Sequence, residues 1–387
     1  MAPPPPMAPP LALFPPAPGI TFTRNGRLDA AVKAAAAALP AGGNGKPVSL
    51  CLIDLGVLAD DPSPPADLPF GGAEDGTVHY TASLVKVGVQ YSLYALRDLA
   101  RRFATLRSPA NGPAFFAAAR AELDPFIARA SPVIAGAPLR REHRIPSWDK
   151  VFTAGRFGSG LAVEFQPGMR NSLENMIVSS ENPETGRCVR GQGYAYLNGA
   201  LEAAGLFDSP TKTGFYVGGD FSGGSTWPYA RIPSANDGDV AQASTAFTVA
   251  KLMALIAVGG LLDKPSCAEM RGRLGRAARG EAKPGHDADQ SWLTRDPSPV
   301  GFDNSRLALD KIGLGPLKTG REVISEGLVL RGPGGRSYAV AYQNGLNNAA
   351  TTRALVAGIR AAILANEALS GASGNAGVPG TGRGTLP

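Results

Sequence analysis

The sequence predicts an α+β protein in three layers, in which an antiparallel sheet of N- and C-terminal strands lies between helices. Three observations favour this fold: strand-like runs gather near the two ends of the chain, a long helical segment follows the last of them, and helical patterns fill the region between. The strand-like runs are residues 48–55, 77–81, 317–322, 324–331 and 336–343. The closing helix is expected at residues 352–369.

The expected helices differ in how much of their surface is apolar. Three of them, at residues 28–39, 192–204 and 244–258, are followed by a glycine or proline that stops them. Asn171 and Glu174 have the spacing of a capping box at the start of another. The helix at residues 83–99 is apolar on every side, so we expect it to run through the middle of the protein and to belong to an all-helical subdomain.

Composition divides the chain into one folded domain and two tails. Residues 1–19 are rich in proline, and residues 371–387 are rich in glycine, proline, serine and threonine, so both are predicted to be disordered. The domain is expected at residues 20–370. Its mostly helical part is residues 83–260, with a basic, helical insertion at about 101–150.

The composition also limits the classes of function. Of 387 residues, 44% are hydrophobic and 18% charged, which is typical of a globular protein, and the net charge of +6 suits an anionic partner. The basic residues are too dispersed to predict nucleic-acid binding. Three distant cysteines and three histidines predict neither a disulfide framework nor a metal site, and no cofactor is expected. Without a signal peptide or a long apolar run, the sequence as it stands predicts a cytoplasmic protein that does not span a membrane.

A serine and a lysine at the start of the apolar helix form a candidate nucleophile and base. Ser-x-x-Lys puts both side chains on one face of a helix, and burial lowers the pKa of a lysine, so that it can take the proton of the serine. The pattern occurs three times, beginning at Ser83, Ser147 and Ser209. Only Ser83 opens an apolar helix, where its partner Lys86 must be buried. The alternative is a lysine whose head reaches the surface.

Two further motifs follow in order along the chain. Ser180-Glu181-Asn182 comes at the end of a predicted helix, and Lys318-Thr319-Gly320 comes at the start of the C-terminal strands. Other copies, Ser234-Ala235-Asn236 and Lys212-Thr213-Gly214, lack this context. The ordered set of three resembles the serine β-lactamase and penicillin-binding protein (D,D-peptidase) superfamily, and class A β-lactamase-like hydrolases most of all, over roughly residues 27–369.

The resemblance implies a role for each motif residue. Ser83 would form an acyl-enzyme with Lys86 as its base, and Ser180 would relay a proton to the leaving group. Asn182 would bind both the substrate amide and Lys86. Lys318 and Thr319 would bind the substrate carboxylate, and Gly320 belongs to the same motif. The N–H of Arg321 would form the oxyanion hole together with that of Ser83. The resemblance implies a small β-lactam, peptide or ester substrate that bears a carboxylate, and a place of work in the periplasm or outside the cell.

One family motif is missing, which leaves two functions open. Class A β-lactamases use the glutamate of ExxLN to activate the water that removes the acyl group, but Tyr194 stands three residues before Leu197-Asn198 here. Asp220 is a speculative substitute for this glutamate. The simpler interpretation is that Asp220 is an ordinary aspartate in a turn. The chain is therefore predicted to be a serine hydrolase, or else a penicillin-binding sensor that is acylated and does not turn over. A Ser-His-Asp esterase would need a GxSxG turn, which the sequence lacks.

Overall fold

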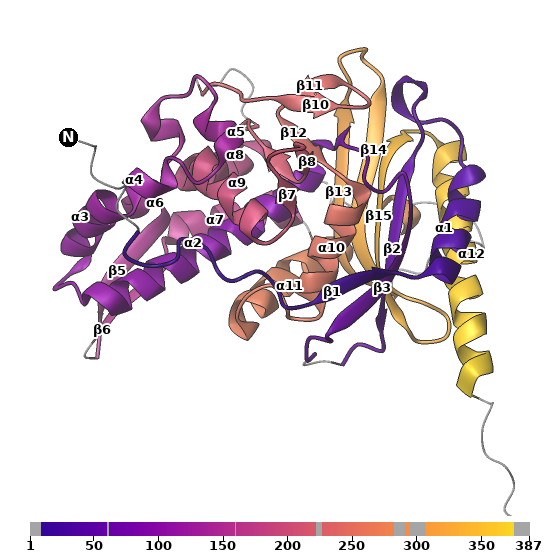
Figure 1. Ribbon diagram of the computed structural model, residues 1–387, viewed down its shortest axis with the longest axis horizontal. Coiled ribbons are helices and arrows are strands. Elements are labelled where there is room, and N and C mark those ends of the chain that lie inside the picture. The colour runs from indigo at the N-terminus through magenta and orange to yellow at the C-terminus, as the bar shows by residue number, and fades with distance from the viewer. Residues whose placement is uncertain are drawn as a thin grey trace, which may run out of the picture.

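The structure is a computed structural model in which a sheet covered by helices lies beside a helical part (Figure 1). It describes residues 9–59, 62–158, 160–221, 227–281, 291–294 and 306–374, without the side chains of Phe157 and residues 369–374.

The sheet is built from both ends of the chain, as the sequence predicts. Its six strands lie in the order β1-β3-β2-β15-β14-β13, and every pair is antiparallel except β1 with β3. The strands are β1 (Thr21–Arg24), β2 (Ser49–Gly56), β3 (Asp67–Ala73), β13 (Leu307–Pro316), β14 (Glu322–Arg331) and β15 (Ser337–Leu346). The chain therefore has the predicted α+β fold.

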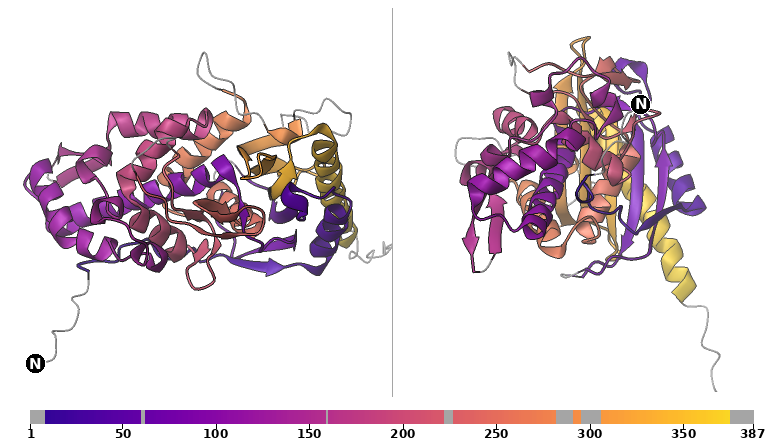
Figure 2. Two further views of the ribbon diagram at one scale, coloured as in Figure 1. Left: turned by 90° about the horizontal axis from the view of Figure 1, so that it is seen from above. Right: turned by 60° about the vertical axis from the view of Figure 1, so that its left-hand side comes forward.

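Alternate residues of the central strands supply two separate hydrophobic cores. Leu50 and Leu52 of β2 face α1 (Gly26–Ala37) and α12 (Ala349–Gly374), while Cys51 and Ile53 belong to the larger core on the other face. There α10 (Ala246–Ala257) crosses the sheet, and the helical part continues beyond it (Figure 2). This face carries the candidate site.

The helical part surrounds α2 (Lys86–Arg107), which is buried over most of its length, as the apolar pattern predicts. It packs against β6, α7, α8 and α9. The other helices and 3-10 turns are η1 (Gly43–Gly45), η2 (Ala82–Val85), α3 (Gly112–Glu122), α4 (Asp124–Ile127), α5 (Pro132–Ala135), η3 (Arg141–His143), α6 (Trp148–Val151), α7 (Pro167–Val178), α8 (Asn182–Gln192), α9 (Tyr194–Ala203), α11 (Lys264–Ala278) and η4 (Trp292–Thr294). The short strands are β4 (His79–Tyr80), β5 (Phe152–Phe157), β6 (Gly160–Phe165), β7 (Phe207–Asp208), β8 (Thr213–Gly214), β9 (Tyr216–Val217), β10 (Ile232–Ser234), β11 (Gly238–Val240) and β12 (Gln242–Ser244).

Two predictions about secondary structure are wrong. Residues 317–321 are a turn and not a strand. The N–H of Gly320 donates to the carbonyl of Leu317, and the N–H of Leu317 donates to the carbonyl of Arg321. The helix that was expected to begin at Asn171 begins at Pro167, because proline suits a first turn, where its missing N–H costs nothing.

The proline-rich segment is not a free tail over residues 9–19. Phe14 packs on Tyr196 with ring centres 5.3 Å apart, and Arg102 donates a hydrogen bond to the carbonyl of Ala12. At the other end α12 extends to Gly374, so residues 371–374 are helical and not part of a tail. The rest of both predicted tails lies outside the described residues.

The three cysteines, Cys51, Cys188 and Cys267, are buried free thiols. No helix in the described part of the chain is long and apolar enough to cross a membrane.

Candidate active site

Ser83 lies in a tight turn between the sheet and the helical part. It is half-buried in η2, directly before Lys86 begins α2. Ala82 has a φ of 48°, a left-handed conformation that an alanine rarely adopts and that is found most often where function requires it. No hydrogen bond to Ser83 Oγ is present among the described residues, so the hydroxyl is not tied to any neighbour that the structure describes.

Two glycines allow this turn to lie directly against strand β13. A Cβ on Gly313 would come within 2.4 Å of the carbonyl oxygen of Thr81 and 3.0 Å of the Leu84 nitrogen, and one on Gly315 would come within 3.0 Å of Ala82 Cβ. Glycine in a strand marks such close approaches of backbone to backbone. Ser325 of β14 fixes the same turn by donating from its hydroxyl to the Thr81 carbonyl, at 3.0 Å.

Lys86 is fully buried, and its ammonium is surrounded by oxygen atoms from one short loop. Nζ donates to the carbonyl of Ser180 at 2.5 Å, to Ser180 Oγ at 3.2 Å and to Asn182 Oδ1 at 2.9 Å. The ring centre of Phe221 lies 5.5 Å from Nζ. The sequence alternative, a lysine whose head reaches the surface, is wrong. A buried cation requires such partners, because otherwise its lost hydration is not compensated.

Ser180 owes its position to an unusual backbone conformation between α7 and α8. Its φ is 55°, and the carbonyl of Asn175 accepts from the N–H groups of both Ser179 and Glu181, which closes the end of α7. Asn182 then opens α8. The first two predicted motifs are therefore brought together: Ser180 and Asn182 both contact Lys86, three residues from Ser83.

A second buried lysine, which the sequence analysis did not identify, completes the cluster. Lys311 of β13 is 1% exposed, and its Nζ donates to Ser180 Oγ at 2.8 Å and to the carbonyl of Ile312 at 3.1 Å. The sequence signal was Lys311-Ile312-Gly313, a Lys-x-Gly pattern in a stretch that was not among the predicted strands. Its middle residue is not threonine, and Lys318-Thr319-Gly320, which does have a threonine, follows seven residues later.

The predicted Lys318 motif is therefore not part of this cluster. Lys318, Thr319 and Gly320 lie in the turn between β13 and β14, where the ammonium of Lys318 donates to the carbonyls of Asp237 and Asp239 at 2.9 and 2.8 Å. Thr319 donates to Asn44, and the carbonyl of Arg321 closes the turn. Lys318 instead lines a cavity of about 280 Å³ at the end of β13. The cavity is also lined by Tyr80, Tyr229, Arg231, Asp237, Asp239, Val240, Ala241, Gln242, Pro316 and Leu317.

The segment with Asp220 approaches the cluster through its neighbour Phe221. Asp220 is fully buried and forms an ion pair with Arg190. Asn198 holds the strand before it, since its side chain accepts from the N–H of Val217 and donates to the carbonyl of the same residue. Asp220 is thus an ion-paired aspartate that lies near the cluster, and residues 222–226 lie outside the described residues.

The other copies of the motifs have structural roles or lie elsewhere. Asn236 is buried and bonds both backbone groups of Tyr80, whereas Ser209 donates to Glu202 and Lys212 lies in the turn before β8. Ser147 and Lys150 line a different cavity. In the described part of the chain, no group of three or more His, Cys, Asp and Glu side chains is arranged to hold a metal ion.

Comparison with known proteins adds a likeness of fold. No family model and no curated protein matches the chain. Among solved structures, it is similar to a β-lactamase from Chitinophaga pinensis (12% identity, 89% of this chain and 99% of that one, TM-score 0.47), a β-lactamase from Sphaerobacter thermophilus (16%, 89% and 97%, 0.46) and PBP-A (15%, 92% and 99%, 0.45).

These proteins belong to the superfamily that the ordered motifs predict, the serine β-lactamases and penicillin-binding proteins. Because the identities and TM-scores are low, the function of this chain must be argued from its own residues.

The strand that leads into the Ser83 turn gives a prediction about pH. His79 is 1% exposed, with Nε2 2.9 Å from Ser49 Oγ, and burial lowers its pKa to about 4. The unfolded chain binds a proton with an ordinary histidine pKa of about 6.5. The free energy of unfolding should therefore fall as the pH is lowered from about 6.5 towards 4, and His79 contributes up to ~1.4 kcal/mol per pH unit in this window.

Urea unfolding of the native protein and of His79→Gln across this range measures that contribution. The variant should show the shallower decline with falling pH. Equal slopes in the two proteins would contradict the buried, neutral state of His79.

Proposed function

We propose that the chain is a serine hydrolase of the β-lactamase and D,D-peptidase kind, which acts through an acyl-enzyme with Ser83 as nucleophile and Lys86 as base. One observation carries the proposal: two fully buried lysines, Lys86 and Lys311, both donate to the hydroxyl of Ser180 beside the Ser83 turn. Buried lysines are costly, and burying two of them around one hydroxyl is expected where protons are moved.

The two lysines determine what the Ser180 hydroxyl can do. A hydroxyl has two acceptor lone pairs and one donor hydrogen. Here Lys86 and Lys311 donate to the oxygen at 3.2 and 2.8 Å, so both lone pairs are used. The remaining O–H is then directed at a third group. In the proposed reaction that group is the leaving atom of the substrate.

The acylation step then balances as follows. Ser83 Oγ attacks the substrate carbonyl carbon and its proton passes to an unprotonated Lys86, which requires Lys86 to have released a proton beforehand. When the bond from the carbonyl carbon to the leaving nitrogen or oxygen breaks, Ser180 gives its proton to the leaving atom and takes one from Lys86. The product is an ester of Ser83 and a free amine or alcohol.

Charge on the carbonyl oxygen needs two donors close to Ser83. We assign one to the N–H of Ser83, as the resemblance implies, and the other to the backbone of β13 in place of Arg321. Strand β13 is at the edge of the sheet in the described part of the chain, so N–H groups along one side of it are not used by a neighbouring strand. Gly313 brings this backbone against the Ser83 turn. Donors fixed in this way stabilise charge that exists only in the transition state.

The proposed substrate class is a small carboxylate-bearing β-lactam, peptide or ester. The cavity at the end of β13 begins beside Tyr80, three residues before Ser83, and offers the exposed cations Arg231 and Lys318. Because Lys318 is held by two carbonyls, we give Arg231 the larger share of carboxylate binding. Asn182, which contacts Lys86, is assigned to the substrate amide as the sequence predicts.

The alternative function, a penicillin-binding protein that stays acylated, is favoured by Asp220. Removal of the acyl group needs a base for water, and the sequence offers no ExxLN glutamate. Asp220 is buried, and its carboxylate already pairs with Arg190 at 2.5 Å. Because the Asp220 carboxylate is held by the Arg190 guanidinium, it is poorly placed to bind and activate a water, so we expect the acyl-enzyme to be hydrolysed slowly.

A comparison of two lysine variants tests which Lys-x-Gly motif serves the reaction. Lys311→Met should slow acylation by a β-lactam roughly 100- to 10,000-fold, because it removes a donor to Ser180 from the proton relay. The matched variant Lys318→Met should slow it less than about tenfold, since only an exposed contact near the carboxylate is lost. Stopped-flow measurement of the acylation rate constant gives both values, with circular dichroism to confirm folding. Equal losses in the two variants would contradict the reassignment.

The fate of the acyl group is tested by mixing the protein with a chromogenic cephalosporin. We expect a burst that releases one equivalent of product per chain, followed by slow turnover. Rapid linear turnover would show that an efficient base for deacylation exists and that the role given to Asp220 is wrong. If Ser83→Ala gave the same trace as the native protein, the nucleophile would be misassigned.

A further inference from the structure

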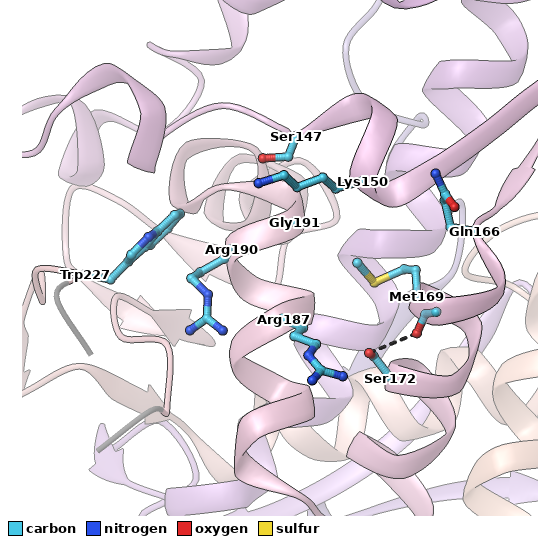
Figure 3. Close-up of a pocket in the computed structure, with 10 residues that line it drawn as sticks. Ser147, Lys150, Gln166, Met169, Ser172, Arg187, Arg190, Gly191 and Trp227 are labelled. Carbon is cyan, nitrogen blue, oxygen red and sulfur yellow. Dashed lines mark hydrogen bonds between the residues drawn. The ribbon is translucent and has the colours of Figure 1, made fainter. Parts of the chain in front are cut away.

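A second cavity lies within the helical part, lined by residues of α6, α7 and α8. It has a volume of about 530 Å³ and opens between α6, α7 and α8 (Figure 3). Its lining consists of Ser147, Lys150, Gln166, Gly168, Met169, Ser172, Arg187, Arg190, Gly191 and Trp227. Arg190 is eight residues along α8 from Asn182, which puts it about 12 Å from the start of the helix. Among the described residues, the cavity shares no lining residue with the Lys86 cluster, and the two are linked through the ion pair of Arg190 with Asp220, the neighbour of Phe221.

The charged groups in the lining of this cavity are all cations. Arg187 pairs with Glu184, and Arg190 pairs with Asp220, but neither carboxylate is among the lining residues. Lys150 is exposed and has no hydrogen-bond or ion-pair partner among the described residues. Three cations and no acidic residue among the lining residues give the concave space a positive potential, and a ligand inside it is partly shielded from water.

Neutral groups add hydrogen bonding and a flat apolar wall. Ser147 lies beside the ammonium of Lys150, and Gln166, whose amide donates to the carbonyl of Asp149, is a further polar residue of the lining. Trp227 is fixed against two rings, with its centre 5.3 Å from that of Tyr194 and 4.7 Å from that of His143. A rigid indole can stack on a planar group at little entropic cost. The cavity also depends on a glycine, because a Cβ on Gly191 would contact Met169 Cε at 2.9 Å.

We propose that this cavity is a binding site for a small anion that carries a planar aromatic group, with the anionic group on Lys150 and Arg190, the ring on Trp227, and Arg187 adding positive charge to the lining. The anionic group is a carboxylate or a phosphate, both of which guanidinium groups bind through paired hydrogen bonds. The Ser-x-x-Lys copy at Ser147 and Lys150 thereby acquires a role in binding rather than in catalysis. The proposal does not depend on the acyl-transfer function.

Isothermal titration of the Ser83→Ala protein tests the site without interference from acylation. The probes are phenyl phosphate, phenylacetate and benzyl alcohol, at low salt. We expect one molecule of an anionic probe to bind per chain, with benzyl alcohol not binding measurably. Tighter binding of phenyl phosphate than of phenylacetate would assign the site to phosphates, and the reverse order would assign it to carboxylates.

Matched variants locate the binding. Lys150→Gln should weaken the anionic probes roughly 3- to 10-fold, while Lys46→Gln, which alters an exposed lysine outside the cavity, should not. Trp227→Leu should reduce the affinity for phenyl phosphate to that for inorganic phosphate. Absence of saturable binding, equal binding by benzyl alcohol, or equal effects of Lys150→Gln and Lys46→Gln would each overturn the proposal.

Discussion

The buried ammonium of Lys86 is the constraint on which the rest of the molecule depends. A cation removed from water costs several kcal/mol unless oxygen atoms replace its hydration. Here they come from the loop of Ser180 and Asn182, and that loop has its shape because Ser180 adopts a left-handed conformation. The helical part must therefore close against the start of α2 for the lysine to be tolerated. The fold and the proposed acyl transfer therefore share one requirement, which is a set of oxygen atoms around the Lys86 ammonium.

The second requirement is close contact between the sheet and the turn that carries Ser83. Gly313 and Gly315 remove the side chains that would hold β13 away from this turn. Lys311, two residues before Gly313 on the same face of the strand, then reaches Ser180 from the sheet side. Ser180 is thus held between a lysine from α2 and one from β13, and a shift of either element would change its hydrogen bonds. The site belongs to the junction and not to either part alone.

Motif order singled out Ser83-Lys86 and Ser180-Asn182, two motifs that the structure brings together at the boundaries of helices, while their catalytic roles stay predictions. It failed for Lys311, since a threonine-containing copy follows in the next turn and short patterns do not reveal where a strand ends. Strands β1 and β3 were also missed: β1 has four residues, and β3 contains a proline and two glycines, which have low strand propensity. The proline-rich segment packs through a few side chains such as Phe14, and its composition gives no sign of this.

The most direct test is to find which serine is acylated. The intact protein is mixed with benzylpenicillin, quenched in acid, digested and analysed by mass spectrometry. We expect one penicilloyl adduct per chain, on the peptide that contains Ser83, and none in Ser83→Ala, while the other Ser-x-x-Lys copies at Ser147 and Ser209 stay unmodified. An adduct on either of those serines, or a Ser83→Ala protein that is labelled as fully as the native one, would contradict it.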